Sequence, residues 1–356
     1  MNVISNDELL SYSLNFQEID RKNNQFVFSE KDSDLKIYFN YKLEINEMND
    51  INDYKIHLFY NKNFAENNIF QVFDGDTRLG WIFPLQAIIS QNHDYVSNPY
   101  FLNYAYIAFL KLLIESEKWG KKLIYREDCN YKLEDLYDIE CTHVFVTSNS
   151  NTNAISEYNF QNYIPALYDK GYLSSPGDNN KIIDSRDKIK LNKISVDLIE
   201  EVFIKYLFNE ILVAKIHPLV KFHMLYQVIE LLIEKIFNFE LKKLLDGLSK
   251  EEKNLFHLKE ELGIIANESD RIRKLFNDYS KFDESRKDLK DLCNKLLEAV
   301  GRDKKKNAEK ALYSVRNLYV HDYRSIPSEL TNYINEINIL FEKVVIETIH
   351  TFKLSE

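Results

Sequence analysis

The sequence predicts a chain in two parts, a mixed α+β domain over residues 1–195 followed by an all-α helical bundle over residues 196–356. Apolar residues recur mainly with period two in the first part and with period 3.6 in the second. Residues 172–193, rich in Ser, Pro, Gly, Asp and Asn, separate the two patterns and are typical of a loop or domain boundary. The chain has 356 residues, 45% of them hydrophobic, which is enough for two separate cores.

Strands are predicted in the first part wherever aromatic and β-branched residues alternate with polar ones. They are expected at residues 25–30, 35–45, 54–60, 69–73, 121–127 and 143–148. Asp74, Gly75 and Asp76 form a sequence typical of a hairpin turn. A helix is expected over residues 101–118, where apolar residues recur at spacings of three and four.

Helices are predicted throughout the second part. The first begins after Pro218 and should end before Gly247. The second should open at a capping box, in which the Ser249 hydroxyl accepts from the Glu252 amide, and close at Gly263. Further helices are expected at residues 268–280, 284–300, 305–322 and 329–353. This order predicts a helical bundle.

The charge of the chain is unevenly distributed. Residues 1–195 contain 20 Lys and Arg against 28 Asp and Glu, whereas residues 196–356 contain 26 against 28. An acidic first domain is a poor RNA platform, so we expect it to sense a signal or to regulate the second. One stretch of the second domain is basic, with a local charge of +4, and five of its cations are predicted to bind RNA: Lys304, Lys305, Lys306, Lys310 and Arg324.

Several classes of protein are excluded by what the sequence lacks. Eight glycines are scattered along the chain without a glycine-rich phosphate loop, which argues against an NTPase or a nicotinamide enzyme. Cys129, Cys141 and His143 lack the paired short spacing of a structural zinc site. We therefore expect no cofactor and no metal. The three cysteines, the lack of a secretion signal and the lack of a long apolar run favour a cytoplasmic protein with no membrane segment.

The segment SVRNLYVHDY, residues 314–323, contains the candidate site. On a helix, Asn317 and His321 are four residues apart and share a face, while Arg316 points about 140° away from His321. One interpretation is a solvated helix end, because the macrodipole favours Arg and His in the last turn. The other is a catalytic set.

The sequence from Arg316 to His321 matches the R-N-x-x-x-H form of the R-x4-6-H motif, and it precedes the last long helix of an all-α domain. In this the region resembles the HEPN superfamily. An earlier amphipathic helix with Tyr226 and Glu230 also resembles a HEPN helix. The resemblance covers about residues 197–354 and implies a metal-independent ribonuclease of an antiphage, abortive-infection or toxin–antitoxin system. It also implies a homodimer through the C-terminal domain, with two copies of the motif in one cleft.

The chemistry of RNA cleavage fits these residue types. Histidine titrates near neutrality, so His321 is the candidate general acid or base. Arg316 would stabilise the charge on the pentacoordinate phosphorane, and Asn317 would orient the imidazole or the ribose. RNA, with tRNA as one candidate, would be cut by attack of the 2′-OH.

Three alternatives stay open. The motif could instead belong to a non-catalytic HEPN interaction or nucleotide-binding module. Arg316, His321 and Tyr323 also match the R-x4-H-x-Y variant of HEPN toxins whose tyrosine is adenylylated, so Tyr323 is either a modification site or a packing residue. The first domain could respond to an antitoxin, a phage-derived trigger or nucleic acid.

Overall fold

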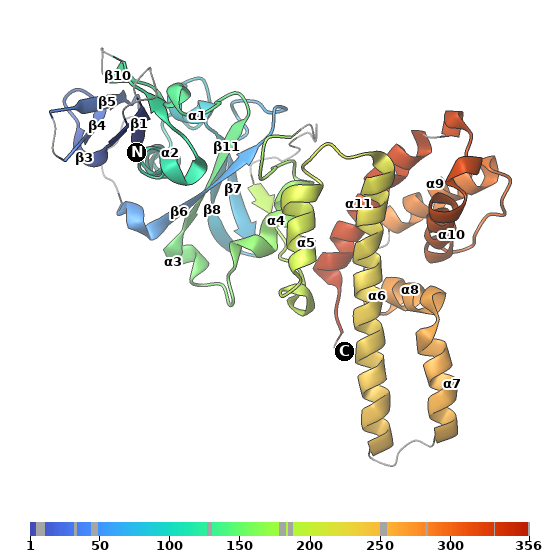
Figure 1. The fold of residues 1–356 in the computed structure, drawn as a ribbon. Coiled ribbons are helices and arrows are strands. Elements are labelled where there is room, and N and C mark those ends of the chain that lie inside the picture. The colour runs from blue at the N-terminus through green and yellow to red at the C-terminus, as the bar shows by residue number, and fades with distance from the viewer. Residues whose placement is uncertain are drawn as a thin grey trace. The chain divides into compact units, whose positions relative to one another are not determined.

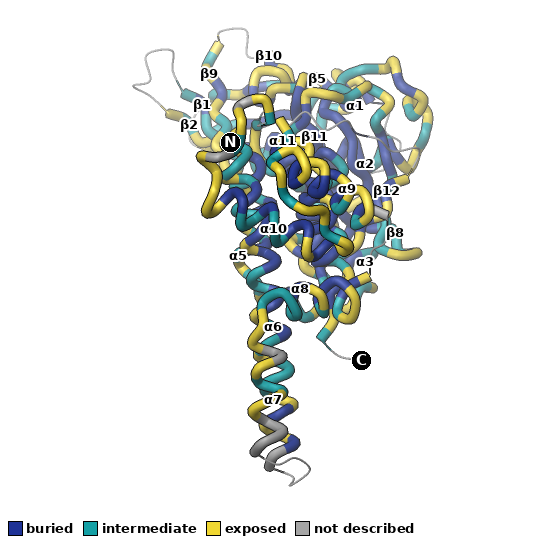
Figure 2. The backbone as a smooth tube through the Cα atoms, turned by 90° about the vertical axis from the view of Figure 1, so that its right-hand side faces the viewer, coloured by how far each residue is buried: buried dark blue, intermediate teal, exposed yellow. Residues whose placement is uncertain are grey.

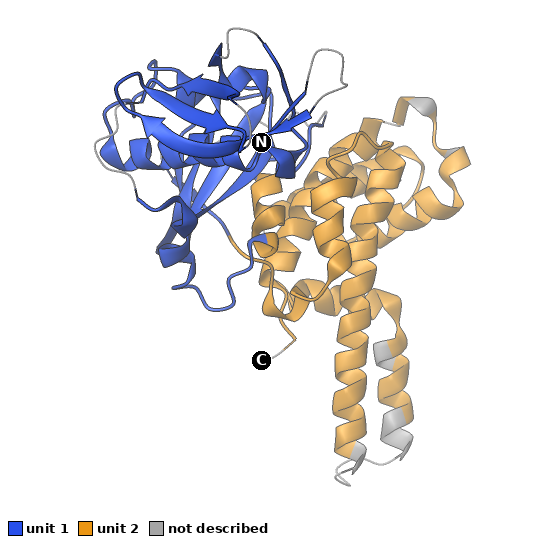
Figure 3. Ribbon diagram, turned by 60° about the vertical axis from the view of Figure 1, so that its left-hand side comes forward, with its two compact units in different colours: residues 1–160, 170–191 blue, residues 161–169, 192–356 orange. Residues whose placement is uncertain are grey.

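The computed structural model describes residues 1–4, 11–31, 34–43, 49–126, 130–177, 183, 188–249, 255–281, 284–330 and 332–354. The chain forms two compact units (Figure 3). Unit 1 comprises residues Met1–Phe160 and Lys170–Leu191, and unit 2 comprises Gln161–Asp169 and Asn192–Glu356. The first unit contains the β-sheets and the second is mostly helical, which confirms the predicted order of an α+β part followed by a helical part (Figure 1).

Unit 1 is built around a five-stranded sheet in which all neighbours are antiparallel except the first pair. In spatial order its strands are β12 (Lys188–Lys190), β7 (Phe70–Asp74), β8 (Thr77–Pro84), β11 (Thr142–Ser148) and β6 (Tyr54–Tyr60). Strand β11 lies inside the sheet, between β8 and β6, and is buried along its whole length, including its polar residues Thr142, His143 and Thr147.

Two smaller sheets complete the strands of unit 1. The four-stranded sheet has the order β10 (Asn130–Tyr131), β5 (Lys36–Asn40), β4 (Gln25–Ser29) and β3 (Asn15–Asp20). The three-stranded sheet has the order β2 (Ser11–Ser13), β1 (Asn2–Ile4) and β9 (Leu123–Ile124).

The core of unit 1 gathers around helix α2 (Pro99–Ile114), most of whose residues are buried (Figure 2). Its aromatic side chains pack edge-on against the sheets, with the rings of Phe109 and Phe26 5.1 Å apart. Two four-residue helices, α1 (Gln86–Ile89) and α3 (Asn149–Thr152), follow β8 and β11. Because α2 is buried on most sides, its sequence is apolar on nearly every face.

Unit 2 is a bundle of helices. They are α4 (Ile164–Asp169), α5 (Val202–Tyr206), α6 (Pro218–Ser249), α7 (Leu255–Ala266), α8 (Glu268–Asn277), α9 (Glu284–Ala299), α10 (Ala308–His321) and α11 (Asn332–Thr351). A π-helical turn, Leu207–Ile211, continues α5. Helix α4 joins this unit because the Tyr168 hydroxyl donates to the buried Glu342 carboxylate of α11 over 3.0 Å.

Most predicted strands and helices are found. The strands expected at residues 25–30, 54–60, 69–73 and 143–148 are β4, β6, β7 and β11, and Gly75 turns the β7–β8 hairpin with φ of +56°. The expected helix over residues 101–118 is α2, although it ends at Ile114.

Two predicted helix ends are wrong. Helix α6 continues through Gly247 and α7 continues through Gly263. A glycine costs a helix only about 1 kcal/mol and ends it when the backbone turns left-handed, as Gly301 does after α9 with φ of +75°. Ser249, the first residue of the predicted capping box, is the last residue of α6, and residues 250–252 lie outside the described residues.

Among the helices of the described residues, none combines the length and the apolar composition needed to cross a membrane.

Candidate functional site

Helix α10 carries the candidate site, and its buried stripe fixes which side chains face outward. Ala311, Leu312, Val315, Leu318 and Tyr319 are buried in the bundle. The ring of Tyr319 meets that of Phe222 on α6 edge-on at 5.0 Å. On a helix held in this way, the opposite stripe consists of Lys310, Ser314, Asn317 and His321, none of which is buried.

Arg316 lies between these two stripes and faces α6. Its Nη2 is 3.4 Å from the Glu230 carboxylate, and its guanidinium carbon is 5.5 Å from the centre of the Tyr226 ring. Its Nη1 also donates to Oδ1 of Asn317 over 3.1 Å. The Arg316 side chain is 23% exposed, so its guanidinium is oriented by neighbours and still reaches solvent.

Two residues of α6, Tyr226 and Glu230, contact the Arg316 side chain. The Tyr226 hydroxyl is buried and has no hydrogen-bond partner among the described residues. Burial raises the pKa of Tyr226, Glu268 raises it further, and the nearby Arg316 opposes the shift, so the phenol is neutral. Gln227 donates to the second oxygen of Glu230 over 2.6 Å. Each carboxylate oxygen of Glu230 therefore has a donor.

His321 occupies a different environment from Arg316. It is the last residue of α10, is exposed, and makes no hydrogen bond to any described residue. The Asp322 amide donates to the Leu318 carbonyl over 2.9 Å and ends the helix there. Within one chain the imidazole and the guanidinium thus leave α10 in different directions, as the sequence predicts. Arg316 and Asn317 are brought together, whereas His321 lies one turn beyond Asn317 on the outward stripe.

The basic residues before and after α10 differ in how far their charges are compensated. Lys304 pairs with Glu298 over 3.0 Å, with both side chains exposed. The backbone of Lys305 is fixed by two hydrogen bonds to the Asn294 side chain, of 2.8 and 2.9 Å. The three exposed cations without an ion pair to a described residue are Lys306, Lys310 and Arg324.

An ion pair between Arg302 and Asp322 joins the loop before α10 to its C-terminal end. No local pattern in the sequence indicates this pair, because twenty positions separate the two residues.

Tyr323 lies just beyond α10, in a short 3-10 turn. Its side chain is 36% exposed, and its ring lies 6.5 Å from that of the buried Tyr319. The residue therefore packs on one side and meets solvent on the other.

No group of three or more His, Cys, Asp or Glu among the described residues is placed to hold a metal ion. Cys129 lies outside those residues, and the His143 ring is fully buried, with its centre 4.8 Å from that of Phe64 and 5.5 Å from that of Tyr172.

Comparison with protein-family models, curated proteins and solved structures finds no match to the chain.

Proposed function

We propose that the chain is a metal-independent endoribonuclease of the HEPN superfamily, acting in the cytoplasm as the effector of a bacterial antiphage or toxin–antitoxin system. The observation that carries the proposal is the arrangement around α10. Arg316 is oriented by α6 and by Asn317, while His321 stands exposed on the outward stripe one turn away. These are the residue types that RNA cleavage without a metal requires.

In the proposed reaction the RNA 2′-oxygen attacks phosphorus, and the bond from phosphorus to the 5′-oxygen breaks. His321 removes the 2′-OH proton, and a second imidazole protonates the leaving oxygen. The products carry a 2′,3′-cyclic phosphate and a 5′-hydroxyl. Arg316 stabilises the negative charge that builds up on the phosphoryl oxygens.

Arg316 must exchange its partner for this role. Its contact with Glu230 is long, at 3.4 Å, and the two side chains are 23% and 33% exposed. Ion pairs of this kind contribute at most about 1 kcal/mol. A phosphate can therefore replace Glu230, while the Tyr226 ring and Asn317 keep the guanidinium in place.

The second imidazole and the divergence of Arg316 from His321 both point to a homodimer through unit 2. Two α10 helices related by a two-fold axis would bring two histidines and two arginines to one cleft. Val320 and Tyr323 flank His321 and are apolar side chains 42% and 36% exposed, which supports a contact surface at this place. Lys306, Lys310 and Arg324 would guide the RNA backbone toward the cleft.

Three variants test the proposal. Arg316→Ala and His321→Ala should abolish cleavage of total RNA and of a tRNA pool in EDTA, and should relieve toxicity in cells. Lys287→Ala, at an exposed position of α9, is the matched control and should cleave like the wild type. Circular dichroism and light scattering would establish that all variants keep the fold and the dimer. Cleavage that survives both site substitutions, or that EDTA removes, contradicts the mechanism.

A non-catalytic binding module is the second candidate, because Arg316 already has a carboxylate partner in Glu230. In that case Arg316→Ala would weaken binding of a nucleotide or partner, and wild-type protein would leave RNA intact even where its expression is toxic.

A further inference from the structure

Unit 1 contains an open pocket of about 460 Å³ that the proposed reaction does not use. Its walls come from the start of α2, the start of β8, the end of β11 with α3, and the segment before β6. The volume falls within the range of about 300 to 1,000 Å³ that is usual for small-molecule sites.

The charge of the pocket is opposite to that of its surroundings. Residues 1–195 carry an excess of Asp and Glu, yet among the described residues that line the pocket there is no Asp or Glu, and the cation is Arg78. Arg78 has no ion-pair partner among the described residues, and it is half-buried. A half-buried guanidinium without a carboxylate favours an anion, and its planar fork matches the oxygens of a phosphate.

The local backbone explains why Arg78 is placed here. Between β7 and β8 the pairing shifts from Val72 and Gly80 to Phe73 and Arg78, so Leu79 is an extra residue, a β-bulge. Such a bulge changes the face of the sheet to which the preceding side chains point. Gly80 lets β8 approach β11 closely, since a Cβ there would lie 1.8 Å from the Val146 carbonyl oxygen.

Tyrosines form the aromatic part of the pocket. Tyr100 and Tyr104 are four residues apart on α2 and share a face, and the rings of Tyr104 and Tyr54 meet edge-on at 5.3 Å. Burial raises the pKa of Tyr104 and the charge of Arg78 opposes this, so the guanidinium lies near the phenol. Tyr100 is 70% exposed, which leaves its ring free to cover a bound planar group.

Amide side chains supply hydrogen bonds with both donors and acceptors. Asn49 and Asn103 each donate to the Tyr54 hydroxyl, over 2.8 and 3.4 Å, which fixes that wall. Asn151, on the opposite wall, makes no side-chain hydrogen bond to a described residue.

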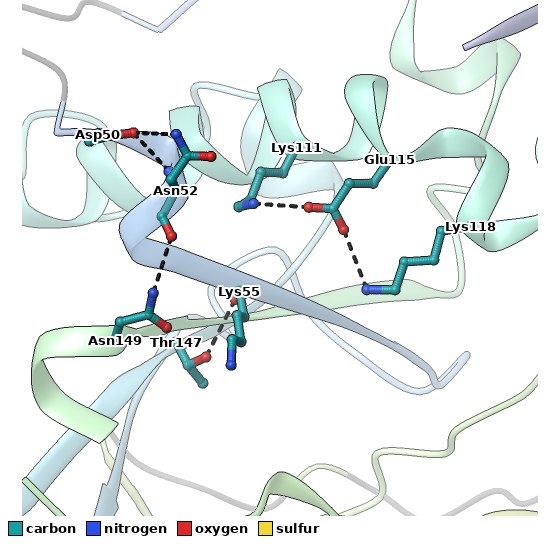
Figure 4. Close-up of polar contacts among 8 residues, drawn as sticks. All are labelled: Asp50, Asn52, Lys55, Lys111, Glu115, Lys118, Thr147 and Asn149. Carbon is teal, nitrogen blue, oxygen red and sulfur yellow. Dashed lines mark hydrogen bonds and ion pairs between the residues drawn. The ribbon is translucent and has the colours of Figure 1, made fainter. Parts of the chain in front are cut away.

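The rim of the pocket is braced by further polar contacts. Asn149 donates to the Asn52 carbonyl over 3.1 Å, and the Asp50 carboxylate accepts from the Asn52 side chain over 2.9 Å (Figure 4). The Asp50 carboxylate is thus engaged in its own turn, and the segment before β6 is tied to the start of α3.

We propose that this pocket binds a nucleoside monophosphate, with its phosphate on Arg78, its base against Tyr100 and Tyr104, and Asn151 on a base or sugar edge. The 16-residue helix α2 begins at the pocket, and the positive end of its dipole adds to the attraction for an anion. The site lies in unit 1 and does not depend on the ribonuclease proposed for unit 2.

The test is isothermal titration of the full-length protein with AMP, GMP, CMP and UMP in turn, with adenosine and inorganic phosphate as partial ligands. At least one nucleotide should bind with a Kd below about 1 mM, and neither partial ligand should match it. Arg78→Gln should weaken binding about tenfold or more, and Tyr100→Ala, a change at an exposed position, about tenfold. Arg21→Gln, at an exposed site away from the pocket, is the matched control.

The outcomes separate clearly. Absence of binding by all four nucleotides overturns the proposal, as does binding that Arg78→Gln and Tyr100→Ala leave unchanged. If inorganic phosphate binds as tightly as the nucleotides, the tyrosines do not contribute to binding. If adenosine binds as tightly as the nucleotides, Arg78 does not contribute. Either result overturns the assignment of a nucleoside monophosphate.

Discussion

Arg286 anchors the start of the helix that carries the candidate site, and its removal should cost about 3 kcal/mol of unfolding free energy. Its Nη2 lies 3.2 Å from the carboxylate of Glu309, in the first turn of α10, and Glu309 is only 2% exposed. Arg286 also donates to the Phe276 carbonyl over 3.1 Å and to Asn277 over 2.8 Å. Arg286→Ala therefore leaves a buried carboxylate whose remaining donor among the described side chains is Asn307.

The magnitude follows from the burial of Glu309. Breaking a buried ion pair from one side costs about 3 to 5 kcal/mol. The lower value applies here, because the Arg286 side chain is 23% exposed and water can enter the space that it leaves. Arg286→Ala combined with Glu309→Gln should recover about 2 kcal/mol, since a neutral amide can stay buried while accepting the bond from Asn307.

The unfolding of the two units can be followed separately, because tryptophan fluorescence reports on unit 1 and helical circular dichroism mainly on unit 2. The chain has two tryptophans, Trp81 and Trp119, and both lie in unit 1, whereas most helices lie in unit 2. In urea, far-ultraviolet circular dichroism should show an earlier transition for Arg286→Ala, while tryptophan fluorescence should not change. A loss of less than about 1 kcal/mol in the unfolding free energy from circular dichroism would contradict the role given to Arg286, as would a double variant no more stable than the single one.

Three further predictions concern stability and reactivity. Gly80→Ala should destabilise unit 1 by about 3 kcal/mol, because the added Cβ would lie 1.8 Å from the Val146 carbonyl oxygen. Gly75→Ala should destabilise it by about 1 kcal/mol. Both losses are measured by tryptophan fluorescence in urea, and equal losses would contradict the close approach of β8 and β11 at Gly80. Burial lowers the pKa of His143 to about 3, so below the usual value of 6.5 the unfolded imidazole takes up a proton that the folded one does not. This residue alone should lower stability by roughly 2 kcal/mol between pH 7 and pH 5, and His57, whose pKa burial also lowers to about 3, adds to the fall. In His143→Phe the fall should be smaller by about 2 kcal/mol, and a fall equal to that of the wild type would argue against this origin. Burial raises the pKa of the Cys141 thiol to about 11 and that of Cys293 further, so iodoacetamide should alkylate both slowly in native protein and quickly in urea, as mass spectrometry of peptides would show; rapid native labelling of Cys293 would contradict its burial.

Local patterns were sufficient for much of the secondary structure. The alternation of apolar and polar residues predicts a strand at residues 54–60, and β6 has these bounds, because one face of the strand is buried and the other is partly exposed. The helix expected at residues 305–322 is α10, which buries Leu312, Val315 and Tyr319 because a helix in a bundle must bury one side. Helix ends were less certain where a glycine, such as Gly263, is tolerated within the helix.

Long-range pairing was not accessible from the sequence. Strand β12 pairs in parallel with β7 across more than a hundred residues, and α4 belongs to unit 2 although it is flanked by unit 1. The pocket around Arg78 depends on a bulge and on segments brought together from four parts of the chain. Local propensity carries no information on such contacts.

Within the candidate site the same division holds. Helix geometry fixed the relation of Asn317 to His321, because both lie on one helix. The partners of Arg316 on α6, Tyr226 and Glu230, lie about 90 residues earlier in the chain, and the structure brings them to it.

The most direct test of the account is analysis of the RNA ends produced by wild-type and His321→Ala protein in EDTA. If His321 is catalytic, wild-type protein yields fragments with 2′,3′-cyclic phosphate and 5′-hydroxyl ends, and the variant yields none. Fragments with 5′-phosphate ends, or the same cyclic ends from both proteins, would contradict catalysis by His321.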